Sequence, residues 1–151
     1  MKLSTTIRYG TRLMLDMAEQ YGQGPVRIRT IAARQGISEK YLEKIVRLLR
    51  KGGLVDGLRG PGGGYTLALP PDKITLADVL EAVQGKVELC PCLDEPESCD
   101  KNLSCKTRKV WNEINEIIWI KLKGITLADL KDSVCPSEDE KQEPDLLETI
   151  L

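Results

Sequence analysis

The positions of the glycines between helical and strand-like patterns in the first half of the chain restrict the folds that it can adopt. Apolar residues recur at helical spacing up to about Tyr21, and two further helical patterns lie on either side of Gly36. Two short strand-like runs, residues 54–58 and 65–69, then enclose the glycine-rich string at 59–64. Two helices joined by a glycine turn and followed by such a hairpin predict a winged helix-turn-helix.

Capping residues indicate where other elements begin. Ser38 occupies the N-cap position of the third helix, and Thr75 that of a fourth. In the second strand-like run, alternation predicts that Tyr65, Leu67 and Leu69 point inward. The predicted fold is therefore mainly α: a winged helix-turn-helix with a two-stranded wing and a long dimerisation helix towards the C-terminus.

These elements divide the chain into four parts. The string Ile-Thr-Leu-Ala-Asp occurs at 74–78 and again at 125–129, and we interpret it as a reused helix start and not as a structural repeat. The acidic, proline-interrupted C-terminal segment is expected to be disordered. The predicted parts are a winged helix-turn-helix domain at 1–84, a cysteine loop at 85–105, the dimerisation helix and a short helix at 106–134, and the acidic tail at 135–151.

Composition excludes several classes of protein. The 151 residues include no histidine, which rules out Ser-His and Cys-His catalysis, and no other catalytic constellation is present, so we expect no enzyme. The most apolar stretch, 110–122, is interrupted by charged and amide residues, so we expect no membrane insertion. Residues 1–18 lack the continuous apolar run of a signal peptide. The sequence therefore predicts a cytoplasmic protein.

The charges are distributed unevenly along the chain. Residues 1–60 contain 12 Lys and Arg against 5 Asp and Glu, whereas residues 61–151 contain 10 against 18. On the third helix, the face opposite the apolar stripe carries residues such as Lys40, Lys44 and Arg47. Alone, this face is typical of any solvated helix. Together with the hairpin and the basic half, it predicts binding to double-stranded DNA, with Arg59 of the wing reaching a minor groove.

Four of the five cysteines lie in one polar segment. Cys90, Cys92, Cys99 and Cys105 alternate there with prolines and acidic residues, whereas Cys135 lies beside the acidic tail and has no assigned role. Clustered thiolates suit an iron-sulfur cluster and also zinc. A metal-free redox switch is the third interpretation, because the expected compartment keeps thiols reduced.

The predicted long helix is apolar around more than one stripe. Eight of the thirteen residues at 110–122 are apolar, so two faces of this helix need burial. One face would pack on its own domain and the other on the same helix of a second copy. The alternative is a core helix buried within one chain. We favour a homodimer, because a single winged helix contacts only one half-site of DNA.

Several of these strings resemble a known family. The similarity runs from Met1 to about Val134 and resembles the IscR-like family of iron-sulfur cluster transcription regulators. It implies a homodimer on a two-fold DNA site, with Glu43 tuning which sites are accepted. The strings that carry it are Arg8-Tyr9, Arg34 to Ser38, Tyr41 to Glu43, Leu48 to Lys51 and Arg59 to Tyr65. The positions that the family uses for DNA contact correspond to Ser38, Lys40, Tyr41, Glu43, Lys44 and Arg59.

The same resemblance implies a cluster site. Cys92, Cys99 and Cys105 are similar to the family's three cysteine ligands, and a 2Fe-2S cluster is expected there. Arg108 stands where the family has a histidine ligand, and Arg8 stands where some relatives use an acidic one. The fourth ligand therefore stays open between Cys90, a carboxylate and another thiolate.

The resemblance implies a regulator of iron-sulfur assembly or related stress genes, controlled by its cluster. Two alternatives remain at this point. One is a metal-free regulator that senses thiol oxidation or a partner protein. The other is a small iron-sulfur electron carrier, which leaves about two-thirds of the chain without a purpose.

Overall fold

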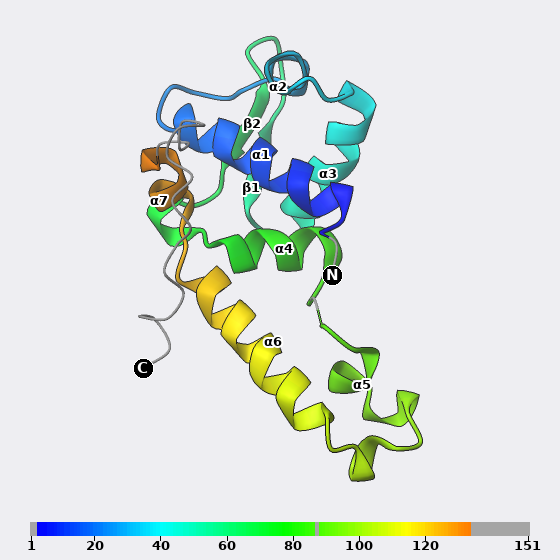
Figure 1. The fold of residues 1–151 in the computed structure, drawn as a ribbon. Coiled ribbons are helices and arrows are strands. Elements are labelled where there is room, and N and C mark those ends of the chain that lie inside the picture. The colour runs from blue at the N-terminus through cyan, green and yellow to red at the C-terminus, as the bar shows by residue number, and fades with distance from the viewer. Residues whose placement is uncertain (1–2, 87, 134–151) are drawn as a thin grey trace.

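The order of elements follows the predicted order closely. The structure is a computed structural model, and it describes residues 3–86 and 88–133. The mainly α fold with a two-stranded wing is confirmed (Figure 1). The helices are α1 (Thr5–Glu19), α2 (Ile28–Gln35), α3 (Glu39–Lys51), α4 (Leu76–Gln84), α5 (Pro91–Asp94), α6 (Arg108–Lys123) and α7 (Leu127–Asp132). The strands are β1 (Val55–Leu58) and β2 (Gly64–Leu67), and short 3-10 turns lie at Pro71–Lys73, Pro96–Ser98 and Asn102–Ser104.

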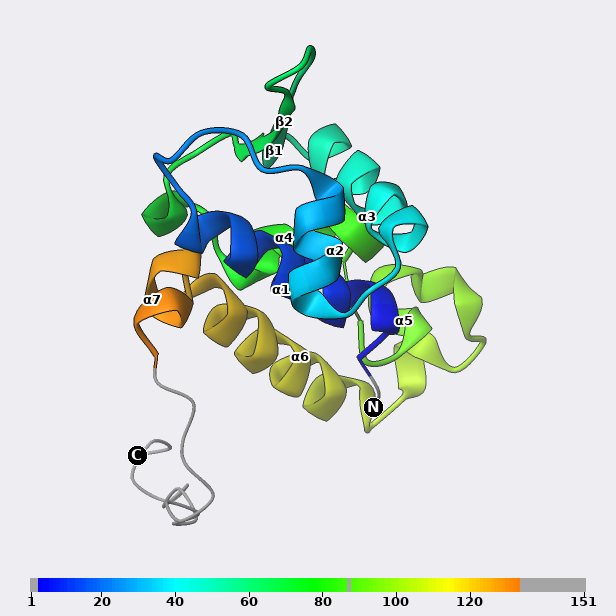
Figure 2. The same cartoon turned by 90° about the horizontal axis from the view of Figure 1, so that it is seen from above.

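Helices α1, α3 and α4 enclose an aliphatic core, with α2 and α7 packed on α1. The side chains of Leu13, Leu42, Ile45 and Val79 are completely buried there. Because the chain has no phenylalanine, branched and unbranched aliphatic residues fill this space. Figures 1 and 2 show α1 crossing the middle of the domain, between the wing side and α4.

The helix-turn-helix has the predicted turn and cap. Gly36 ends α2 with a φ of 63°, a left-handed conformation that glycine adopts without strain. Ser38 then caps α3, because its hydroxyl oxygen accepts a hydrogen bond from the backbone N–H of Tyr41 at 3.3 Å. These two residues set the direction in which α3 leaves the turn.

The wing is an antiparallel pair extended by one bridge. Val55 lies opposite Leu67, and the backbone of Tyr65 forms two hydrogen bonds of 2.9 Å with Val26. A Cβ atom on Gly64 would lie 2.6 Å from the Val26 carbonyl oxygen, so this approach requires glycine. Leu67 is buried as predicted. The prediction for Leu69 was wrong: it is 45% exposed, because β2 ends at Leu67 and the chain turns away.

The repeated pentapeptide forms two helix starts that pair with each other. Thr75 and Thr126 form an antiparallel bridge, and each begins its helix with a reciprocal capping box. The N–H of Leu127 donates to the Ile74 carbonyl at 2.9 Å. The side chains of both residues are completely buried in the core. The interpretation as a helix start holds, and the pairing joins α7 to α4.

Helix α6 leaves the domain at an angle and holds the cysteine segment at its far end (Figure 1). Trp119 and Asn115 are its buried residues. None of the helices in the described part of the chain has the length and apolar character to cross a membrane. The predicted acidic tail at 135–151, with Cys135, lies outside the described residues.

Candidate nucleic-acid interface and cysteine segment

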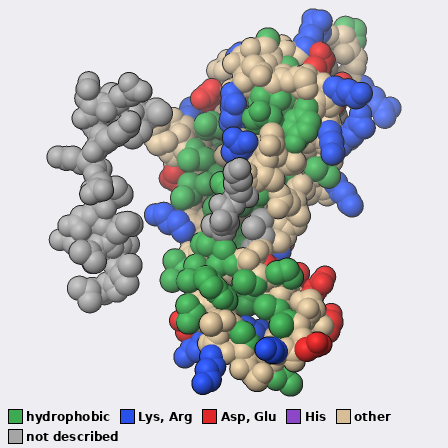
Figure 3. All heavy atoms as spheres, turned by 45° about the vertical axis from the view of Figure 1, so that its right-hand side comes forward, with side chains coloured by type: hydrophobic (Ala, Val, Ile, Leu, Met, Phe, Trp, Pro, Cys, Tyr) green, Lys and Arg blue, Asp and Glu red, His purple; other side chains and the backbone are tan. Residues whose placement is uncertain are grey.

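The polar face of α3 is open to solvent. Ser38, Lys40 and Lys44 are exposed, and Glu43 is half-buried beside Arg47, whose guanidinium lies 3.9 Å from its carboxylate. Lys and Arg side chains gather around the upper part of the molecule in Figure 3, which holds the winged helix. This placement leaves the ammonium groups free to meet a phosphate backbone.

Tyr41 differs from the other predicted DNA contacts. Its hydroxyl forms a 3.0 Å hydrogen bond with the Thr6 hydroxyl, and its ring meets the Tyr9 ring edge-to-face at 5.7 Å between centroids. The side chain is half-buried between α1 and α3. Its ring therefore supports the N-terminal end of α3, and its hydroxyl already has a partner within the protein.

The wing loop is anchored at its tip. Arg59 is exposed at the end of β1, where the loop to β2 begins. The guanidinium of Arg27, in the N-cap position of α2, donates a hydrogen bond to the Pro61 carbonyl oxygen. Sequence analysis did not single out Arg27, because its partner lies 34 residues away. This contact holds the wing tip against the start of α2.

The cysteine segment presents four free thiols in the described part of the chain. Cys99 is exposed, and Cys90, Cys92 and Cys105 are half-buried among short turns. Thiolates are the donors that iron-sulfur clusters use, so the chemistry of the donor set fits. Among the described residues, however, no three Cys, Asp or Glu side chains are placed to hold one metal ion. The segment would have to close to bring its sulfurs together.

Cys105 has the most perturbed thiol of the segment. Its sulfur lies 3.4 Å from the Thr107 hydroxyl, and this hydrogen bond, with the backbone N–H groups of Arg108 and Thr107, lowers the pKa of Cys105. The guanidinium charge of Arg108 acts in the same direction. These contacts favour the thiolate, which is the form that binds metals and attacks electrophiles.

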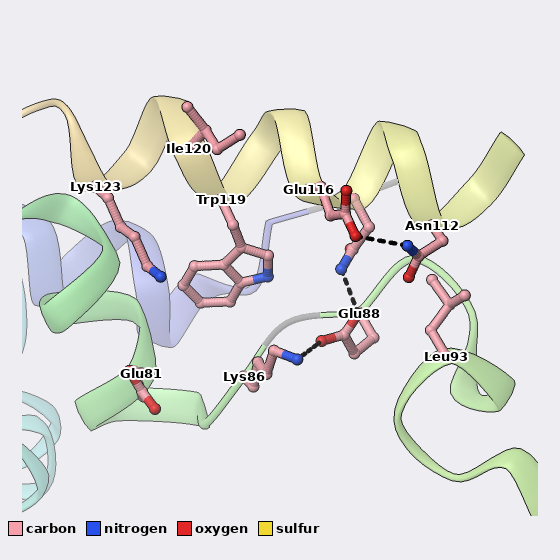
Figure 4. A pocket seen from close by; sticks show the side chains of 10 residues that line it. Glu81, Lys86, Glu88, Leu93, Asn112, Glu116, Trp119, Ile120 and Lys123 are labelled. Carbon is pink, nitrogen blue, oxygen red and sulfur yellow. Dashed lines mark hydrogen bonds and ion pairs between the residues drawn. The ribbon is translucent and has the colours of Figure 1, made fainter. Parts of the chain in front are cut away.

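A buried asparagine attaches the cysteine segment to α6. The side-chain oxygen of Asn115 accepts from the Leu89 N–H at 3.2 Å, and its amide donates to the Glu88 carboxylate. Lys86 pairs with Glu88 at 2.9 Å. Lys86, Glu88 and Trp119 line a cavity of about 430 Å³. Figure 4 shows the Lys86–Glu88 pair beneath α6, on the side towards which the Trp119 indole points.

A second anchor lies closer to the cysteines. Arg108, in place of the family's histidine, donates from Nε to the Cys92 carbonyl oxygen at 3.4 Å. Sequence analysis also missed Asn115, although an asparagine between Ile114 and Ile118 was a usable signal for a buried polar contact.

The outward face of α6 is apolar and uncovered in the single chain. Ile117 and Ile120 are 66% and 71% exposed. Beside this helix, a cavity of about 490 Å³ lies between α1, α4 and α6, lined mainly by apolar side chains such as Leu3, Leu80 and Leu122. Green side chains cover much of the lower part of the molecule in Figure 3. Exposed apolar areas of this kind are typical of protein interfaces.

The fold, the exposed basic face of α3 and the wing define a class of protein, the winged helix-turn-helix regulators of transcription. Within this class the chain belongs to the Rrf2 family, whose model is described as iron-dependent transcriptional regulator and matches residues 3–133. Regulators of this family bind DNA.

Named relatives agree with this assignment. The chain is 44% identical to protein rrf2 of Nitratidesulfovibrio vulgaris, over 90% of this chain and 92% of that protein. It is 42% identical to the regulator IscR of Aliivibrio salmonicida, over 86% of this chain and 77% of that one. The second match confirms the resemblance to the IscR-like family, and that relative is named as a transcriptional regulator and not as an enzyme.

Two solved structures share the fold. The global cysteine regulator CymR of B. subtilis matches with a TM-score of 0.73 and 34% identity, over 89% of this chain and 99% of that one. IscR of T. potens matches with a TM-score of 0.69 and 36% identity, over 91% and 94% of the two chains. The family thus includes regulators named for cysteine control beside the IscR proteins.

Proposed function

We propose that this regulator is a homodimer whose affinity for a two-fold DNA site depends on an iron-sulfur cluster of the 2Fe-2S type. The observation that carries the proposal is a segment with four free thiols, attached by Asn115 to the helix with the exposed apolar face. Binding to chromosomal DNA places this activity in the cytoplasm.

Cys92, Cys99 and Cys105 would hold the cluster. The cluster would supply an iron- and redox-sensitive link between them. The Thr107 hydroxyl and two backbone N–H groups favour the Cys105 thiolate, which is the form that binds iron. Arg108 carries no free electron pair to donate, so the fourth ligand must be another residue. Cys90, two positions before Cys92, is the nearest further thiol in the sequence.

The proposed DNA contacts come from α3 and the wing. Lys40 and Lys44 would meet phosphates, and Ser38 and Glu43 lie on the same helix near the turn. Arg59 would enter a minor groove from the base of the wing loop. Tyr41 would contribute mainly by holding α3 against α1. Two copies joined through α6 would place two such surfaces on one duplex.

A metal-free thiol regulator is the second candidate. It is favoured by the separation of the thiols among the described residues and by the lowered pKa of Cys105. A relative named as a global cysteine regulator shares the fold. An electron carrier is not pursued, because the chain belongs to a family of transcription regulators.

Anaerobic purification tests the two candidates. The protein is isolated and reconstituted without oxygen, and iron, acid-labile sulfide and the visible spectrum are measured. Two iron and two sulfide per subunit are expected by the proposal, with loss of colour in Cys92→Ser, Cys99→Ser and Cys105→Ser. Binding of the loaded and stripped forms to one duplex, selected by the protein from a random library, must differ. If the protein contained neither iron nor sulfide, the cluster proposal would be wrong and the metal-free thiol regulator would be favoured. The same metal analysis would detect zinc.

A further inference from the structure

A buried carboxylate connects α1 to the end of α2. Asp16 is 2% exposed, and it is one of two buried polar residues in the described part of the chain. Its Oδ2 accepts from Arg34 Nε and from Gln35 Nε2, each at 3.0 Å, and its Oδ1 accepts from Arg34 Nη2. These three donors all come from the last two residues of α2.

Gln35 is held from a second side. Its side-chain oxygen accepts from Arg12 Nε at 3.0 Å, and its backbone oxygen accepts from Arg12 Nη2 at 2.6 Å. The side-chain NH2 group of Gln35 thus donates to Asp16, and its side-chain oxygen accepts from Arg12, both of α1. The side chain has one orientation in which both contacts form, so it locates the last turn of α2 relative to α1.

The location of the network matters more than its strength. Gly36 follows Gln35 directly, and Ser38 begins α3 two residues later. Only Asp16 of this ion pair is buried, and the cost of desolvating its carboxylate offsets much of the attraction to Arg34, so the pair adds little net stability but accepts few alternative geometries. Apolar packing of Ile31 and Ile28 on α1 tolerates small rotations that a forked, charge-assisted pair does not.

We propose that Asp16 is a positioning residue for DNA binding. Through Arg34 and Gln35 it holds the end of α2, and so it sets the angle at which α3 and its lysines face the duplex. The inference rests on the proposed DNA contacts of α3. It assigns a functional task to a residue of α1 that is buried and touches no DNA.

The test compares two Asp→Asn variants of matched chemistry. Asp16→Asn removes the charge from the network, and Asp129→Asn removes a carboxylate from the capping box of α7, away from the turn. Affinity is measured at fixed salt for the duplex that the wild type selects from a random library. Asp16→Asn should bind about tenfold more weakly, which corresponds to about 1.4 kcal/mol, whereas Asp129→Asn should stay within about twofold. Equal affinity of Asp16→Asn and wild type would overturn the proposal.

Hydrogen exchange provides a readout that needs no DNA. The Ile37 N–H is bonded to the Ala32 carbonyl at 3.1 Å across the turn. In Asp16→Asn, amides 33–38 should exchange faster while those of α4 keep their protection. Unchanged exchange at the turn would contradict the positioning role. If the wild type bound no DNA, the proposed function would fail, and exchange would still decide the role of Asp16.

Arg34→Lys covers the case in which Asp16→Asn does not fold. The lysine keeps the charge but loses the fork, and Arg34 is 40% exposed, so the exchange is tolerated sterically. It should also bind the selected duplex several times more weakly than the wild type. Wild-type affinity with wild-type exchange at the turn would show that the forked geometry is dispensable and would overturn the proposal.

Discussion

Tyr41 packs between two helices at a position that the family resemblance assigns to DNA contact. The hydroxyl is bonded to Thr6, and the ring edge meets Tyr9. Arg12 lies over the Tyr9 ring, with its guanidinium carbon 5.8 Å from the ring centroid. A residue expected from the resemblance to contact DNA therefore also joins α3 to α1.

Tyr41→Phe separates the two tasks. Removing the hydroxyl deletes the bond to Thr6, which should lower the free energy of unfolding by about 0.5–1.5 kcal/mol. DNA affinity should change little, because the hydroxyl is engaged within the protein. Tyr41→Ala should reduce both quantities. Thermal unfolding and a binding titration on the same samples measure the two effects, and a large loss of affinity in Tyr41→Phe would show that the hydroxyl contacts DNA.

Cys105 should react at a lower pH than an ordinary thiol in the metal-free protein. The pKa of Cys105 is lowered, first by the Thr107 hydroxyl, so its thiolate is populated below the ordinary thiol value of 9.0. Alkylation rates of Cys105, measured by mass spectrometry from pH 6 to pH 10, should therefore rise at lower pH in the wild type than in Thr107→Val. Identical profiles for Cys105 in the two proteins would contradict the hydrogen-bond assignment.

At the scale of elements, α6 has two different faces. Trp119 packs towards the domain, and Ile118 lines the cavity beside α1 and α4. Ile117 and Ile120 point away from the domain and are largely exposed. The sequence predicted that two faces of this helix need burial, and the tertiary structure shows which residues lie on each face.

Ile117→Glu should therefore produce folded monomers. A charge placed on the exposed face would be buried without a partner in a dimer, but it costs the single chain little. Sedimentation velocity reports the mass, and circular dichroism reports the fold. Lys121→Glu, an exposed charge change on the same helix, is the control and should remain dimeric. If Ile117→Glu remained dimeric, the dimer interface would have to lie on another part of the surface.

In the proposed complex, the wing would be a second element in contact with DNA. Arg59 stands at its base, and the Arg27 bond to Pro61 holds its tip. Arg59→Ala should weaken specific binding by about 1–3 kcal/mol, because a groove contact is lost. Thermal stability should stay at the wild-type value, since Arg59 is exposed. Unchanged affinity at fixed salt would remove the wing from the interface.

At the scale of the whole molecule, the chain separates a basic half from an acidic one. Residues 1–60, which include the helix-turn-helix, carry the excess of Lys and Arg. The second half carries the cysteine segment and most of α6, so DNA and an effector would act on different surfaces. Asn115, Arg108 and the pairing of Thr75 with Thr126 connect the two.

DNA binding should accordingly fall steeply with salt. Lys44→Ala should reduce the slope of log affinity against log salt by about 1 for each half-site, or about 2 for the dimer, because each subunit neutralises one fewer phosphate. Titrations at four salt concentrations measure the slope. Asp16→Asn, if it misorients α3, should reduce the slope as well. A wild-type slope near zero would argue against contacts with the phosphate backbone.

The sequence by itself determined the local elements of this protein. Ser38, Gly36 and the Thr75 capping box were placed correctly, because caps and turns depend on residues within about four positions of each other. The cysteine segment was recognised for the same reason, since its thiols are close in sequence.

Only the tertiary structure decided which distant residues meet. It brought Asp16 to Gln35, joined the two pentapeptides that sequence analysis treated as independent helix starts, and left Leu69 exposed. Among the described residues, it grouped no three Cys, Asp or Glu side chains around one metal position. These outcomes depend on how helices pack across the core. That packing is set by summed shapes and buried areas along the whole chain, and no local pattern encodes it.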